Sequence, residues 1–146
     1  MDISKQRIAV YGLILNQIKK EEFLIIKRAA HDTHPNLWEL PGGAVDLGED
    51  PQQAIKREIS EETGLKTGTL YPLTVLNGHS VSDTSMQVIR IVYLCLQTES
   101  ESIKLSPDHS EYRWITFTKL PPLEYSDIFT KTLKKINDYP HLITDR

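Results

Sequence analysis

The segment from Asp50 to Gly64 constrains the fold more than any other part of this 146-residue chain. Aspartate is a preferred helix N-cap, proline suits the first turn, and glycine often ends a helix in the left-handed conformation. The intervening stretch AIKREISEET, which follows Pro51 after two glutamines, consists mainly of good helix formers. The segment therefore predicts a helix with defined ends, and Ile55 and Ile59 mark the side that faces a core.

Three carboxylates fall on one face of this predicted helix. Glu58, Glu61 and Glu62 stand at positions i, i+3 and i+4, a spacing at which like charges destabilise a helix. Hard divalent cations bind carboxylate oxygens, so Mg²⁺ would relieve this repulsion, and Arg57 is placed to hold the Glu61 carboxylate. A solvated acidic face explains the same spacing equally well. The helix alone therefore leaves a metal site and a plain surface both open.

The rest of the chain predicts an α+β fold with a mixed β-sheet and two helices. β-forming residues predict strands over 7–15, 23–28, 38–40, 70–76, 86–97 and 112–117, the first two as a hairpin. Pro41-Gly42-Gly43 and Asn77-Gly78 predict turns, 99–109 a polar loop, and 126–138 a final helix. We expect one domain over residues 1–146, because no linker or repeat interrupts the pattern.

Composition excludes several classes of protein. A net charge of −3 argues against a module that binds polymeric nucleic acid, since such modules usually carry a basic surplus. Cys95 is the only cysteine, which excludes an intrachain disulfide framework, and its place in a predicted strand suggests packing. The longest apolar run, 88–96, is too short to span a bilayer, and no signal segment opens the chain. We therefore expect a cytoplasmic protein without a membrane partner.

The helix and the residues before it together match a longer pattern, G-x5-E-x7-R-E-U-x-E-E-x-G-U, in which U is aliphatic. Every specified position is met, by Gly43, Glu49, Arg57, Glu58, Ile59, Glu61, Glu62, Gly64 and Leu65. This stretch resembles the Nudix box, the signature of the Nudix hydrolase family, and the flanking LWELPGG is also typical of that family. Outside these residues the resemblance is one of architecture only.

The resemblance implies a Nudix-type α/β/α sandwich with a mixed sheet, in which the box forms a loop–helix–loop. It also implies hydrolysis of a nucleoside diphosphate linked to a group X, with Mg²⁺ or Mn²⁺ as the cofactor. By position in the box, Glu58, Glu61 and Glu62 resemble the metal ligands, joined by the backbone carbonyl of Gly42. Arg57 resembles the arginine that orients these carboxylates, with Glu49 as its partner.

The general base and the phosphate contact are less constrained by the resemblance. Some family members take the base from the box, which implies Glu58 or Glu61, whereas others use a later loop, where Glu111 is the matching residue. Glu111 could equally be a further metal ligand or a surface acid at a strand edge. Arg28 resembles the basic residue near substrate phosphate, or is a plain surface arginine, and we expect His109 in a polar loop.

A short chain with little beyond the core is similar to the MutT-like group, which acts on nucleoside or deoxynucleoside triphosphates. The expected partner is therefore a small nucleotide, with a nucleoside monophosphate and pyrophosphate as products. ADP-ribose or a nucleotide sugar is the alternative substrate, although the proline that some ADP-ribose hydrolases carry after the box is missing from 79–82. A non-catalytic nucleotide sensor is the alternative from another class. Such modules usually lose box carboxylates, and this chain keeps them.

Overall fold

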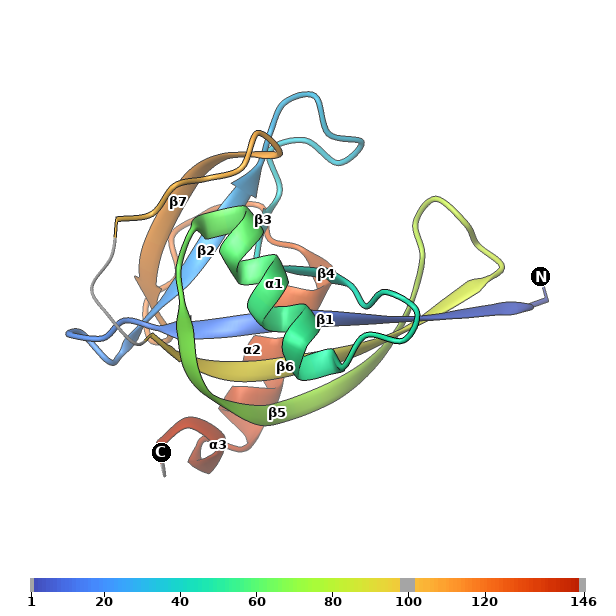
Figure 1. Cartoon of the computed structure of the whole chain (residues 1–146). Coiled ribbons are helices and arrows are strands. Elements are labelled where there is room, and N and C mark those ends of the chain that lie inside the picture. The colour runs from blue at the N-terminus through green and yellow to red at the C-terminus, as the bar shows by residue number, and fades with distance from the viewer. Residues whose placement is uncertain (1, 98–101, 145–146) are drawn as a thin grey trace.

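The computed structural model describes residues 2–97 and 102–144, in which a seven-stranded mixed β-sheet forms the centre of the molecule (Figure 1). The strands are β1 (Lys5–Leu15), β2 (Glu22–Arg28), β3 (Trp38–Glu39), β4 (Gly42–Ala44), β5 (Thr67–His79), β6 (Met86–Gln97) and β7 (His109–Thr116). The helices are α1 (Pro51–Thr63), α2 (Asp127–Asp138) and α3 (His141–Thr144). The main strand order is β3-β2-β1-β6-β5, with β4 paired to β1 and β7 paired to β2.

Side-chain alternation along the strands builds two hydrophobic layers, one on each face of the sheet. On β1, Val10 and Ile14 point to the face covered by α1, whereas Leu13 and Leu15 point to the face covered by α2. The β1–β6 pair is parallel and the other pairs are antiparallel, including the expected β1–β2 hairpin. The predicted α/β/α sandwich with a mixed sheet is therefore confirmed (Figure 1).

Helix α1 begins and ends where its capping residues predict. The Asp50 carboxylate accepts a hydrogen bond of 2.7 Å from the backbone N–H of Gln52. At the other end Gly64 adopts φ +74°, and its N–H donates to the carbonyl of Ser60. Ile55 and Ile59 are fully buried under this helix, as their spacing predicts. Helix α2 likewise follows an N-cap, Ser126, and buries an apolar face made of Ile128, Phe129, Leu133 and Ile136.

Two predicted turns are wrong, because their glycines lie in strands. Gly42 and Gly43 belong to β4, where a Cβ on Gly42 would lie 2.1 Å from the carbonyl oxygen of Val10. Asn77 and Gly78 belong to β5, and the connection to β6 lies over 80–85 instead. These glycines are needed for close approach to neighbouring atoms rather than for a change of chain direction.

The remaining predictions concern the C-terminal third and the membrane. The polar loop expected over 99–109 lies partly outside the described residues, since 98–101 are not described, and its last residue begins β7. The short helix α3 was not expected from the sequence. Within 2–97 and 102–144, no helix combines the length and apolar character needed to cross a membrane.

Candidate functional site

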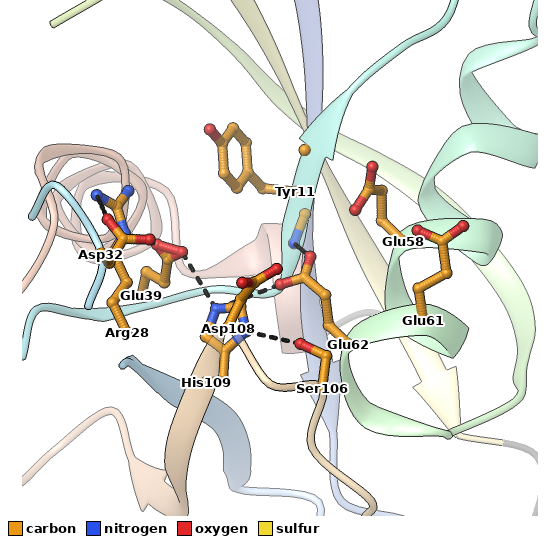
Figure 2. Close-up of a pocket in the computed structure, with 12 residues that line it drawn as sticks. Tyr11, Arg28, Asp32, Glu39, Glu58, Glu61, Glu62, Ser106, Asp108 and His109 are labelled. Atoms are coloured by element: carbon orange, nitrogen blue, oxygen red, sulfur yellow. Dashed lines mark hydrogen bonds and ion pairs between the residues drawn. The ribbon is translucent and has the colours of Figure 1, made fainter. Parts of the chain in front are cut away.

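An acidic cavity of about 390 Å³ opens between α1 and the strand ends beside it (Figure 2). Its lining residues come from α1, from strands β1 to β4, from the loop between β2 and β3, and from the start of β7 with the segment before it. They are Tyr11, Arg28, Asp32, Glu39, Gly42, Gly43, Glu58, Glu61, Glu62, Ser106, Asp108 and His109. The fold thus brings the three carboxylates of the helix to one cavity. We call this space the acidic cavity.

Arg57 holds the carboxylates of the box in place from behind this cavity. Its Nε and Nη2 donate to the two oxygens of Glu49, at 2.8 and 3.0 Å, and Nη2 also donates to the carbonyl of Ala44. Its Nη1 donates to Glu58 at 3.0 Å and to Glu61 at 3.3 Å. The hydrogen bonds from Arg57 and from the Asp46 N–H lower the pKa of Glu49 to about 2. The predicted contact of Arg57 with Glu61 is present, and so is the one with Glu49.

The two glycines of β4 let the backbone approach the helix carboxylates. A Cβ on Gly43 would lie 2.7 Å from the Glu58 carboxylate, so a larger residue there would displace that side chain. The N–H of Gly42 donates to Glu62 Oε1 at 3.0 Å. The backbone of β4 and the carboxylates of α1 therefore meet at one end of the acidic cavity.

One further carboxyl group, that of Glu39, lies with Glu62 and a histidine in the buried part of the cavity wall. Glu39 and Glu62 are each 8% exposed, and His109 Nε2 lies 3.6 Å from Glu39 and 3.4 Å from Glu62. Burial, together with the charges of Glu39 and Glu58, raises the pKa of Glu62 well above its ordinary value. The expectation that His109 lies in a polar loop is wrong, because it begins β7 and turns inward (Figure 2).

The donor chemistry of the cavity fits a hard divalent cation. Clustered carboxylate oxygens are the ligands that Mg²⁺ prefers, and a cation would favour the charged form that burial opposes at Glu62. Among the described residues, no group of three His, Cys, Asp or Glu side chains stands in a position to hold a metal together. The structure thus gathers the donors around one cavity without presenting an assembled ligand set.

Of two further residues that the sequence predicted for the site, one lines the acidic cavity and the other does not. Arg28 lines the acidic cavity, where its Nε donates to Glu39 at 2.5 Å and its Nη1 lies 3.9 Å from Asp32. Glu111 does not line it. The Glu111 side chain is 49% exposed on β7, and its carboxylate lies 3.7 Å from Lys27 and farther from Arg113.

Comparison with known proteins gives one consistent result. The model of the NUDIX domain matches residues 5–135. The 8-oxo-dGTP diphosphatase of Escherichia coli is 43% identical over 63 residues, which are 43% of this chain and 46% of that protein. This match thus covers less than half of the relative's length. The ADP-ribose pyrophosphatase of Methanocaldococcus jannaschii is 33% identical over 118 residues, 81% of this chain and 66% of that protein.

A solved structure extends the likeness to the whole fold. The crystal structure of a MutT NUDIX hydrolase from Burkholderia pseudomallei superposes with a TM-score of 0.76 at 26% identity. The superposition covers 91% of this chain and 99% of that one. The arrangement of sheet and helices described above is therefore the arrangement of that structure.

Proposed function

The chain belongs to the NUDIX domain family, and on this premise we propose that it hydrolyses a nucleoside diphosphate linked to a further group X. The observation that carries the proposal is the acidic cavity, where Glu58, Glu61 and Glu62 face one space from one helix. A pyrophosphate is polyanionic, so these acids would repel it unless a cation lies between them. The activity we propose is therefore dependent on Mg²⁺ or Mn²⁺.

Glu58, Glu61, Glu62 and the carbonyl of Gly42 are the groups we propose to hold the cation. A Mg²⁺ ion held by these groups would supply charge neutralisation at the phosphate oxygens and would lower the pKa of an attacking water. Arg57 keeps the Glu58 and Glu61 carboxylates together during this step, through the hydrogen bonds described above.

The proton of the attacking water needs an acceptor within the cavity. We propose Glu58 or Glu61 for this role rather than Glu111, because only the first two line the acidic cavity. We propose that Arg28, which also lines the cavity and contacts Glu39, binds a phosphate oxygen of the substrate.

Among substrates we propose a nucleoside or deoxynucleoside triphosphate, hydrolysed to a nucleoside monophosphate and pyrophosphate. The similarity over 63 residues to the 8-oxo-dGTP diphosphatase of Escherichia coli supports this choice. ADP-ribose or a nucleotide sugar is the second candidate, favoured by the similarity over 81% of the chain to an ADP-ribose pyrophosphatase. Retention of all three helix carboxylates favours either substrate over a non-catalytic sensor.

The experiment that tests the proposal is a substrate panel with Mg²⁺ and with EDTA. It compares nucleoside triphosphates, an oxidised deoxynucleoside triphosphate, ADP-ribose, dinucleoside polyphosphates and nucleotide sugars by release of phosphate and pyrophosphate. We expect Mg²⁺-dependent release of pyrophosphate from triphosphates. Nucleotide binding without turnover of any substrate would support the sensor instead.

A further inference from the structure

A second, smaller cavity of about 210 Å³ adjoins the acidic cavity and shares Tyr11 and Arg28 with it. The cationic residues on its walls are Arg7, Arg28, Arg90 and, when protonated, His79, and none of the described residues that line it is acidic. The two adjoining spaces therefore differ in the sign of their charge. We call the second one the basic cavity.

Arg90 is the most deeply seated of these cations. Its side chain is 12% exposed, and its Nε and Nη1 are buried without a hydrogen-bond partner. Gly78 makes this placement possible, because a Cβ there would lie 2.3 Å from Nη1. The Arg90 side chain on β6 thus fills the space left by the missing side chain of Gly78 on the neighbouring strand β5, and it is not a freely exposed surface arginine.

The charge of Arg90 is only weakly balanced by the protein. The nearest carboxylate, Asp127, lies 3.5 Å from Nη1, is 65% exposed, and is shared with Lys131 at 3.0 Å. The Nη2 of Arg90 donates to the carbonyl of His79 at 3.4 Å, near the outer limit for a hydrogen bond. Buried charges are ordinarily paired, and the one carboxylate beside this guanidinium is exposed and shared with a second cation.

We propose that the basic cavity binds an anionic group X of the substrate, with Arg90 as the residue that selects it. The proposal rests on the function proposed above, which places the pyrophosphate in the acidic cavity. It narrows X to a group that carries a phosphate or a carboxylate, as in a triphosphate or a sugar acid, and disfavours neutral sugars.

Size and continuity support this assignment. A volume of about 210 Å³ is below the range of about 300–1,000 Å³ typical of sites that enclose a whole small molecule. The basic cavity is therefore suited to one group of a larger ligand. Because Tyr11 and Arg28 line both spaces, a ligand whose pyrophosphate lies in the acidic cavity can extend past them toward Arg90.

The test compares ligands that differ in the charge of X, by calorimetric titration with Ca²⁺ in place of Mg²⁺, so that a cation can still lie between the acids and the pyrophosphate. Product analysis after each titration checks that the ligand has stayed intact. UDP-glucuronate and UDP-glucose differ mainly in one carboxylate, and this pair tests for recognition of a carboxylate. UTP and UDP-glucose form the second pair, which tests for recognition of a phosphate. We expect the anionic member of each pair to bind about tenfold or more tightly, as a charged hydrogen bond would provide. The two arms show whether carboxylate, phosphate or both are accepted.

Three variants connect the preference to the basic cavity. Arg90→Gln should reduce the ratio of the two dissociation constants to near one, whereas Arg113→Gln, an exposed arginine outside both cavities, should keep it. Arg7→Gln, at the exposed rim, should reduce the ratio partly, and it serves as the test if circular dichroism shows that Arg90→Gln does not fold.

Equal binding within each pair, no binding of either pair, or a preference that survives in Arg90→Gln would overturn the proposal. Hydrolysis with Mg²⁺ is measured separately on the same ligands. A charge preference without turnover of any ligand would contradict the proposed function and leave the basic cavity supported. Turnover without a charge preference would support the proposed function and contradict the role of the basic cavity.

Discussion

Arg57 donates hydrogen bonds to four residues through one guanidinium. It binds Glu49 through two nitrogens, a backbone carbonyl through one of these, and Glu58 and Glu61 through the third. A lysine has no planar fork of donors and could not replace these contacts at once. The spacing of charged residues in the box therefore lets one arginine bind carboxylates on the helix and on the loop before it.

Glu61 and Glu62 are the residues whose loss should most directly affect turnover. We expect Glu61→Gln and Glu62→Gln each to lower Mg²⁺-dependent pyrophosphate release at least about 100-fold, because each removes a negative charge from the proposed cation site. Glutamine keeps the side-chain length and, at Glu62, an oxygen for the Gly42 N–H. Steady-state rates over a range of Mg²⁺ concentrations provide the measurement. Near-normal turnover in both variants would contradict the metal assignment.

Glu111 should behave as a surface residue. Its half-exposed carboxylate lies near Lys27 and outside the acidic cavity, so Glu111→Gln should change kcat and KM by less than about twofold. The same assay provides the measurement, with Glu61→Gln as the reference for a severe loss. A large fall in kcat would return Glu111 to the role of base or ligand.

At the scale of elements, strand β4 and helix α1 approach each other so closely that a single methyl group matters. Gly43→Ala should displace Glu58 and lower kcat at least about tenfold, because its Cβ would lie 2.7 Å from that carboxylate. Gly48→Ala is the matched control, since Gly48 has φ +81° and open space around its missing Cβ. It should cost about 1–3 kcal/mol of stability and leave kcat nearly unchanged.

The outcome is read from kcat and from the midpoint of denaturant unfolding for both variants. Equal effects of the two substitutions on kcat would mean that the approach of β4 to Glu58 has no special importance. A normal kcat in Gly43→Ala would mean that the Glu58 side chain relocates without cost.

Local sequence patterns predicted α1 well, because capping residues and helix spacing act within a few positions of one another. The glycine turns failed for the opposite reason. Gly43 and Gly78 have no side chains because Glu58 and Arg90, distant in sequence, occupy the space beside them. The neighbouring residues alone do not show whether a glycine is needed for such a close approach or for a turn.

The same limit applies to the site. The box carboxylates could be predicted because they follow one another on one helix, but His109 and Glu39 come from β7 and β3. Only the folded sheet brings them against Glu62. A glutamate between the buried residues Trp38 and Leu40 was the one local signal available, since a buried carboxyl group needs a partner.

At the scale of the whole molecule, the sheet places two adjoining cavities of opposite charge beside its central strand β1. Tyr11 of β1 lines both, Glu58 and its neighbours reach the acidic one from α1, and Arg90 reaches the basic one from β6. The net charge of −3 conceals this separation. The distribution of charge, rather than its sum, is therefore what bears on the ligand.

The acidic cavity should also make the stability of the whole fold depend on pH and on Mg²⁺. The pKa of Glu62 is raised above its ordinary value of 4.5 by burial and by Glu39, so above that value the folded state retains a proton that the unfolded state has lost. Raising the pH from 5 to 8 should therefore lower the unfolding temperature in EDTA. Glu62→Gln has no proton to lose there, and its unfolding temperature should vary less over this range.

Saturating Mg²⁺ should reverse the loss in the wild type, because a ligand that binds only the folded state adds about 2.7 kcal/mol at 100 times its dissociation constant. For a chain of this size that corresponds to an increase of several degrees. Calorimetric scans of wild type and Glu62→Gln at pH 5 and pH 8, with EDTA or Mg²⁺, measure both effects. Glu111→Gln should show the wild-type pattern, since its carboxylate is outside the cavity. An identical pH response in wild type and Glu62→Gln would place the titrating group elsewhere, whereas loss of only the Mg²⁺ effect would separate cation binding from the buried proton.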